Sequence, residues 1–152
     1  MELDAKVHQE IQRLSEEGDT LASQDKYDDA IEVYRKALSL VPEPHNQWEA
    51  ATWLLAAIAD AAYLSGDMPS ARQALDEAMT CPGAVGNPFL HLRRGEVLFE
   101  QNELDASADE LIRAYGIAGN KIFESEPKKY IDFLGTRAKS VKKSPFSFLR
   151  KK

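Results

Sequence analysis

The sequence predicts an all-α fold of stacked helical hairpins, and three observations support this class. Apolar residues recur at helical spacing along most of the 152-residue chain, and no stretch alternates convincingly like a β-strand. Small residues recur at matched positions of successive helical segments, which indicates an internal repeat. Turn signals such as Ser65-Gly66-Asp67 and Gly119-Asn120 separate segments of helix length.

Seven helices are expected, over about residues 3–23, 27–40, 45–65, 68–80, 88–101, 104–117 and 127–139. The first carries apolar residues at helical spacing and ends at Asp25-Lys26. The second has Asp28 and Asp29 in its first turn, where the helix dipole favours acids, and Pro42 and Pro44 end it. The third is apolar on nearly every side, so we expect it to be covered at the centre of the stack.

The remaining elements follow from turn and cap residues. The third helix ends at Gly66, because glycine adopts the left-handed conformation at low cost. The longest loop, residues 81–87, follows the fourth helix, and Pro88 is a favoured first residue for the fifth. The seventh helix carries Phe133 and Leu134, which can cover the apolar edge that the sixth leaves.

The repeat has two independent markers. In the first helix of each hairpin the small residues are Gly18, Ala59 and Gly95, spaced 41 and then 36 residues apart. In the second helix they are Ala37, Ala78 and Ala114, with the same two spacings. Because both markers agree, the chain is predicted to contain three hairpins with insertions in the connecting loops.

This pattern resembles the tetratricopeptide repeat (TPR) family over about residues 11–117. The first copy matches best, at Gly18, Leu21, Tyr27, Ala30, Tyr34, Ala37 and Pro42. Later copies depart from the pattern at Met68 and Ser107, and Leu14, Leu55 and His91 stand where the family usually has tryptophan. The resemblance implies a right-handed solenoid of three helical hairpins and a C-terminal capping helix. We therefore expect one domain, residues 1–139, with repeats at about 3–43, 44–82 and 87–118, a capping helix at 127–139, and a basic tail at 140–152.

The same resemblance implies a partner-binding surface on the concave face, which the first helix of each hairpin lines. The implied residues, expected to be exposed, are Gln12, Asp19, Trp53, Asp60, Tyr63, Phe89, Leu92, Glu96, Phe99 and Glu100. They are rich in aromatics and acids and include no lysine or arginine, which suits a partner with basic and apolar side chains. The aromatics have an alternative role as packing between adjacent repeats.

The charge is unevenly distributed. The net charge of −6 is the sum of −13 over residues 1–120 and +7 over residues 121–152. An acidic body should repel nucleic acid and attract cationic surfaces. The tail, with interleaved basic and aromatic residues, could contact nucleic acid or an anionic membrane, remain solvated, or fold back on the acidic body.

No catalytic residue, cofactor or metal site is predicted. His8, His45 and His91 lack metal-ligand spacing, and Cys81 has no histidine nearby in sequence to activate it. No phosphate-binding glycine loop is present. The first 25 residues do not resemble a signal peptide and no window is long and apolar enough to span a membrane, so a cytoplasmic protein is expected.

A second resemblance sharpens the functional hypothesis. Residues 87–134 are similar to small stand-alone bacterial TPR proteins encoded beside polymorphic toxins, which implies an immunity protein that binds and neutralises a cognate toxin domain. A general TPR adaptor, a secretion chaperone or a scaffold subunit is the alternative. A co-chaperone that grips an acidic C-terminus is disfavoured, because Asp19, Asp60 and Glu96 would repel such a ligand.

Overall fold

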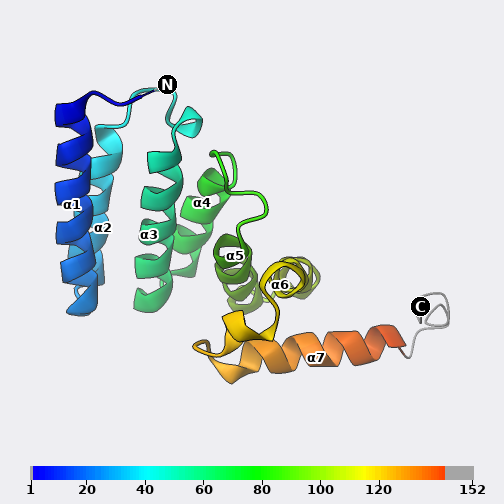
Figure 1. The fold of residues 1–152 in the computed structure, drawn as a ribbon. Helices are drawn as coiled ribbons and strands as arrows, with labels where there is room; N and C mark the ends of the chain where they lie inside the picture. The colour runs from blue at the N-terminus through cyan, green and yellow to red at the C-terminus, as the bar shows by residue number, and fades with distance from the viewer. Residues whose placement is uncertain (1, 143–152) are drawn as a thin grey trace.

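The computed structural model describes residues 2–142, and within this range the chain forms seven α-helices and two short 3₁₀ turns (Figure 1). The helices are α1 (Ala5–Ser23), α2 (Tyr27–Ser39), α3 (Glu49–Ser65), α4 (Met68–Ala78), α5 (Pro88–Glu100), α6 (Leu104–Ala118) and α7 (Lys128–Lys142), and the turns are η1 (His45–Gln47) and η2 (Asn120–Phe123). The predicted all-α class and hairpin order are confirmed.

Local residues fix several helix ends, among them Gly66 and Pro88, which the sequence predicts. The carboxylate of Asp67 accepts a hydrogen bond from the backbone N–H of Ser70 at 3.1 Å and caps α4. The Asn87 side chain does the same for Phe89 at 2.9 Å, ahead of Pro88 in α5. Gly66 ends α3 with a φ of 88°, a conformation that costs glycine little.

Two helix boundaries differ from the prediction by more than two residues, and one short element is unexpected. The segment expected to begin the third helix at residue 45 forms η1 first, and α3 begins at Glu49. Turn η2 has no counterpart among the expected elements, because its sequence shows no helical periodicity. Helix α7 continues to Lys142, so the predicted tail at 140–152 starts inside a helix, and residues 143–152 lie outside the described part of the chain.

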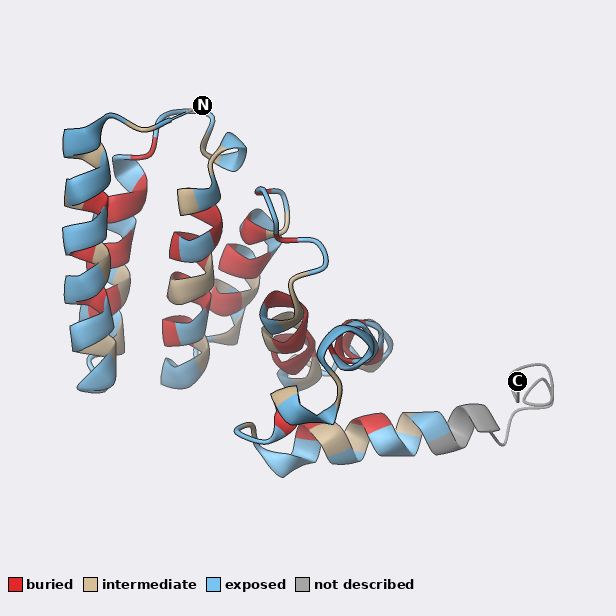
Figure 2. Ribbon diagram, viewed as in Figure 1, coloured by how far each residue is buried: buried red, intermediate tan, exposed pale blue. Residues whose placement is uncertain are grey.

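The helices pack as three successive hairpins, α1–α2, α3–α4 and α5–α6, with buried residues on their facing sides (Figure 2). One apolar cluster joins α1 to α4 and reaches the start of α5, and a second joins α5, α6, η2 and α7. Helix α3 packs on both α2 and α4, as its apolar sequence suggested. It is not covered all round, however, because Trp53 and Leu64 remain 55% and 54% exposed.

The junction between the second and third hairpins is held by polar contacts. Helix α5 packs less extensively on α4 than α3 does on α2, and the last hairpin is turned relative to the first two (Figure 1). Arg94 on α5 donates to Asp76 on α4 at 3.1 Å, and Arg72 on α4 pairs with Glu103 just before α6. These charged contacts replace part of the apolar packing that joins the first two hairpins.

Two glycines allow the closest approaches between helices. A Cβ built on Gly18 of α1 would lie under 3.0 Å from ring carbons of Tyr34 in α2. A Cβ on Gly95 of α5 would lie 2.7 Å from side-chain carbons of Leu111 in α6. Two of the small-residue markers therefore mark positions where a neighbouring side chain fills the space of a missing methyl group.

We expect Gly18→Ala to destabilise the fold by about 1–3 kcal/mol, because the Tyr34 ring must shift in a packed interface. Gly135→Ala in α7 is the matched control, since a Cβ added there would meet nothing within 4 Å. That control should stabilise the protein by about 0.5–1 kcal/mol through helix propensity alone. Urea denaturation of both variants measures the effect, and equal shifts would contradict the close-approach explanation.

Candidate functional site

The candidate site is the surface formed by matched side chains of α1, α3 and α5, which we call the first-helix face. The ten residues predicted for it divide into two groups. Five side chains are exposed, and these are Gln12, Asp19, Trp53, Asp60 and Phe89. The other five contact the segment that follows α6, and these are Tyr63, Leu92, Glu96, Phe99 and Glu100. Of these five, Glu100 is also an exposed residue.

An ion pair sets the register between α3 and α5. Arg93 Nε donates to Asp60 Oδ1 at 2.8 Å. Trp53 lies two turns before Asp60 on α3, and Phe89 lies one turn before Arg93 on α5, so both aromatics lie on the N-terminal side of this pair. Trp53 is 55% exposed and Phe89 is 68% exposed, which places two large aromatic surfaces on the same face in contact with water.

Asp19 adds a fixed carboxylate on α1. The Tyr34 hydroxyl donates to Asp19 Oδ1 at 2.6 Å. Burial is the main cause that raises the pKa of Tyr34, and this hydrogen bond is the second cause. The side chain of Asp60 stays 53% exposed despite its pairing. The open part of the face thus combines exposed aromatics with carboxylates whose positions are held by hydrogen bonds.

Arg93 adds a cation to this face, although the ten predicted residues include none. Its NH1 donates to Glu96 Oε1 at 2.8 Å and to Glu126 Oε1 at 3.0 Å, and the guanidinium stacks on Tyr63, 4.3 Å from the ring centroid. The side chain is only 17% exposed. Its place three residues before Glu96 could have revealed it, because i and i+3 side chains are neighbours on a helix.

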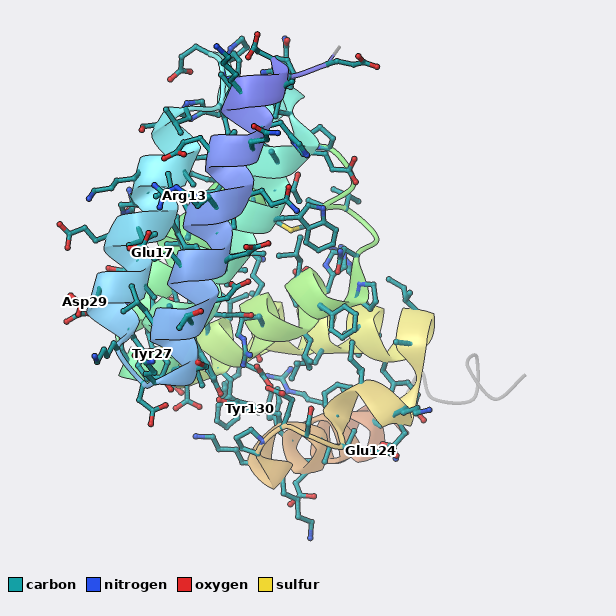
Figure 3. The ribbon with its side chains drawn as sticks, turned by 60° about the vertical axis from the view of Figure 1, so that its left-hand side comes forward. Arg13, Glu17, Tyr27, Asp29, Glu124 and Tyr130 are labelled. Carbon is teal, nitrogen blue, oxygen red and sulfur yellow. The ribbon has the colours of Figure 1, made fainter. Side chains whose placement is uncertain are left out.

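The start of α7 covers the C-terminal half of the face. Tyr130 Oη donates to Glu100 Oε2 at 2.9 Å and lies 2.6 Å from Tyr63 Oη, so the Tyr63 hydroxyl donates to Tyr130. Phe99 meets the Tyr130 ring edge-on at 5.4 Å. In Figure 3, Tyr130 lies between α7 and the ends of the N-terminal helices. Lys129 adds an ion pair with Glu100 at 2.8 Å.

The expectation that Leu92 and Glu96 are exposed is wrong. Leu92 packs in the cluster that includes Phe123 of η2 and Tyr130 of α7, and Glu96 has no exposed surface. The covering segment includes η2, which the sequence pattern does not predict.

Burial changes the ionisation of Glu96. It raises the pKa of this carboxyl to about 9, the neighbouring Glu126 raises it further, and Arg93 opposes the shift. Among the described residues, Glu96 Oε2 has no hydrogen-bond partner. The raised pKa favours a neutral Glu96, which avoids a second buried negative charge beside Glu126.

The other groups with possible chemistry are structural. Gly86 N–H donates to His91 Nε2 at 3.0 Å, so the ring hydrogen is on Nδ1, which donates to Glu110 at 3.0 Å. Burial raises the pKa of the Cys81 thiol, which disfavours a reactive thiolate. Within residues 2–142 no cluster of three metal-ligating side chains occurs, and no helix there is long and apolar enough to cross a membrane.

We expect stability to fall as pH rises from about 4.5 to about 9, in part through Glu96. The folded protein keeps a proton on this carboxyl over that range, whereas the unfolded chain releases it near pH 4.5. Glu96→Gln should therefore be more stable than the wild type at pH 8 and similar to it at pH 5. Urea denaturation across this range measures the difference, with Glu32→Gln at an exposed site of α2 as the control. Parallel pH profiles for wild type and Glu96→Gln would contradict a protonated Glu96.

Comparison with known proteins places this geometry in a fold family. Residues 12–44 match the tetratricopeptide repeat family. No curated protein matches the chain by sequence. Among solved structures, the C-terminal TPR-containing domain of a putative FK506-binding protein of Plasmodium falciparum is similar over 99% of this chain and 97% of its own, with a TM-score of 0.71 at 15% identity.

Two further structures were solved with bound peptides. The Yersinia enterocolitica type III secretion chaperone SycD, in complex with a peptide of the translocator YopD, aligns over 85% of this chain and 93% of its own, with a TM-score of 0.67 at 17% identity. The first TPR of Spaghetti (RPAP3), bound to an HSP90 peptide, aligns over 88% and 96%, with a TM-score of 0.65 at 20% identity. The chain therefore contains a tetratricopeptide repeat at residues 12–44 and has the fold of TPR domains.

Proposed function

We propose that this chain is a non-catalytic protein-binding module that holds its partner against the exposed half of the first-helix face. The observation that carries the proposal is the pair of exposed aromatics, Trp53 and Phe89, on the same face as the carboxylates of Asp19 and Asp60. Large aromatic side chains beside fixed charges are the usual anchors of protein interfaces.

The exposed aromatics need an explanation beyond packing. Elsewhere in the stack, first-helix residues such as Leu54 and Ile58 are buried, and Tyr63 and Phe99 pack beneath α7. Trp53 and Phe89 lie beyond the reach of this cover and leave apolar surface in water. Binding a partner would bury that surface, which is favourable by roughly 25 cal/mol for each Å² removed from water.

The fold comparisons support a binding role of this kind. TPR domains are typically non-catalytic binding modules, and the solved SycD and RPAP3 structures each hold a peptide. The ligand chemistry should nevertheless differ from that of SRMEEVD, the acidic HSP90 peptide bound to the RPAP3 domain. Carboxylates at Asp19 and Asp60 would repel acidic side chains and favour a ligand with lysine or arginine next to its apolar anchors.

The finer proposal is that the partner is a toxin domain that the chain neutralises by covering a basic surface. The net charge of −13 over residues 1–120 supports it, because an acidic protein is attracted to cationic proteins over long range and at a faster rate. The second candidate is a secretion chaperone, and the structural similarity to SycD favours it. Both candidates use the same face but differ in the fate of the partner.

We expect Trp53→Ser combined with Phe89→Ser to weaken partner binding by about 10–100-fold while the protein stays folded, because both side chains are exposed anchors. The matched control is Ile112→Ser with Ile117→Ser, which removes two side chains from α6 that are also about half exposed. Calorimetric titration of each variant with the partner measures the affinities. An equal loss in both double variants, or in neither, would place the interface elsewhere.

If a toxin domain is encoded beside the gene, co-expression with it tests the finer proposal. If the chain is an immunity protein, cells survive the toxin, and the two proteins elute as one complex in size-exclusion chromatography. Asp19→Asn should weaken the rescue, because it removes a charge while an amide oxygen can still accept from Tyr34. Absence of both rescue and complex would contradict neutralisation, whereas a partner that needs the chain only to stay soluble would favour the chaperone.

A further inference from the structure

We infer that the exposed half of the first-helix face also binds the C-terminal tail, residues 143–152, of a second copy of this chain. This inference uses the face assigned above to partner binding, but it needs no external partner. It follows from the chemistry of the tail, from a contact already present inside the molecule, and from the distance that the tail can span.

The tail, KSPFSFLRKK, has an apolar centre between two basic ends. Phe146, Phe148 and Leu149 form the centre, with Lys143 before them and Arg150 to Lys152 after them. These ten residues hold four positive charges and no acid. They therefore offer the apolar and cationic groups that a face with exposed aromatics and carboxylates can bind.

The open half of the face has the complementary groups. Trp53 and Phe89 are each more than half exposed, and together they offer apolar surface on two adjacent helices. Asp19 and Asp60 are exposed acids on the same face. The aromatic rings can take the apolar centre of the tail, and the carboxylates can pair with its basic ends.

The molecule already binds a basic and aromatic segment on this face. At the start of α7, Lys129 pairs with Glu100 at 2.8 Å and Tyr130 packs edge-on against Phe99. This contact occupies the C-terminal half of the face. The N-terminal half has exposed aromatics on α3 and α5, and it carries no such segment among residues 2–142. The exposed acids Asp19 and Asp60 lie at its border, toward the C-terminal ends of α1 and α3.

Reach argues against a tail bound to its own face. Tyr130 is hydrogen-bonded to Tyr63, and Trp53 lies ten residues before Tyr63 in α3, about 15 Å away along the helix. From Tyr130, α7 leads away from the first two hairpins for about 18 Å before it ends at Lys142 (Figure 1). Phe146 and Phe148 follow Lys142 by only four and six residues, so they can extend roughly 13–22 Å from it.

A fully extended tail that ran back along α7 would therefore reach no further than the start of that helix. It would not place both aromatic rings on Trp53 at the far end of α3. The tail of a neighbouring copy has no such limit, because α7 ends at a point that lies away from the stack (Figure 1). Two copies that each bind the other's tail form a closed dimer, in which the same contact occurs twice.

Two variants separate binding between copies from binding within one copy. The tail variant carries Phe146→Ser and Phe148→Ser, and the face variant carries Trp53→Ser and Phe89→Ser. Each keeps one half of the contact and loses the other. Sedimentation velocity of the full-length wild type over a range of concentrations should show a monomer–dimer equilibrium that weakens at least about tenfold between roughly 0.05 and 0.5 M salt.

Each variant alone should be monomeric at concentrations where the wild type is dimeric. An equimolar mixture should form a heterodimer, because one intact face then meets one intact tail. A synthetic peptide of residues 143–152 should dissociate the wild-type dimer and change the fluorescence of Trp53 in a Trp48→Phe background. The Ile112→Ser and Ile117→Ser control should dimerise like the wild type.

A wild type that stays monomeric at every concentration would overturn the inference. Dimers that survive the tail variant would also overturn it, since the contact would then lie elsewhere. If mutating the tail changed Trp53 fluorescence equally at every protein concentration, the tail would bind the face of its own copy. That result would reject binding by the tail of a second copy. None of these results depends on the external partner, so failure here is distinguishable from failure of the proposed function.

Discussion

The Arg93 guanidinium is the group on which the arrangement of the C-terminal half depends. It bonds to Asp60 on α3, Glu96 on its own helix and Glu126 before α7, and it stacks on the Tyr63 ring. Without it, the carboxyl groups of Glu96 and Glu126 would meet in a largely buried space, and a charge on either would cost free energy without compensation. One cation therefore fixes the second hairpin, the third hairpin and the capping segment relative to one another.

This arrangement determines which part of the first-helix face remains available. The capping segment contacts Arg93 through Glu126 and Tyr63 through Tyr130. It therefore covers the C-terminal ends of α3 and α5 and does not reach their N-terminal turns. Trp53 and Phe89 lie on the uncovered turns. The contacts of Glu126 and Tyr130 thus determine how much of the first-helix face is covered. Trp53 and Phe89 lie just beyond the covered part.

The sequence predicts the hairpins well because their signals are local. Gly18 and Gly95 mark close helix approaches, and Asp67, Asn87 and Gly66 mark helix ends, each through contacts with nearby residues or with the other helix of its hairpin. The environment of Glu96 is not local, because it includes Glu126, which lies between η2 and α7. A position can belong to the correct helix face and still be buried, since repeat register says nothing about what covers the last repeat.

The weakening of the repeat toward the C-terminus has a physical basis in the same contacts. Where the pattern has a small residue, Ser107 is buried and its hydroxyl donates to the Gly95 carbonyl at 2.7 Å, so a hydrogen bond satisfies the polar atom that the substitution introduces. His91, at a position where the family usually has tryptophan, is buried with hydrogen bonds at both ring nitrogens. The last hairpin is therefore held by specific polar contacts where the first is held by small and aromatic side chains. In this hairpin, Arg93 of α5 meets the capping segment on the first-helix face through its ion pair with Glu126.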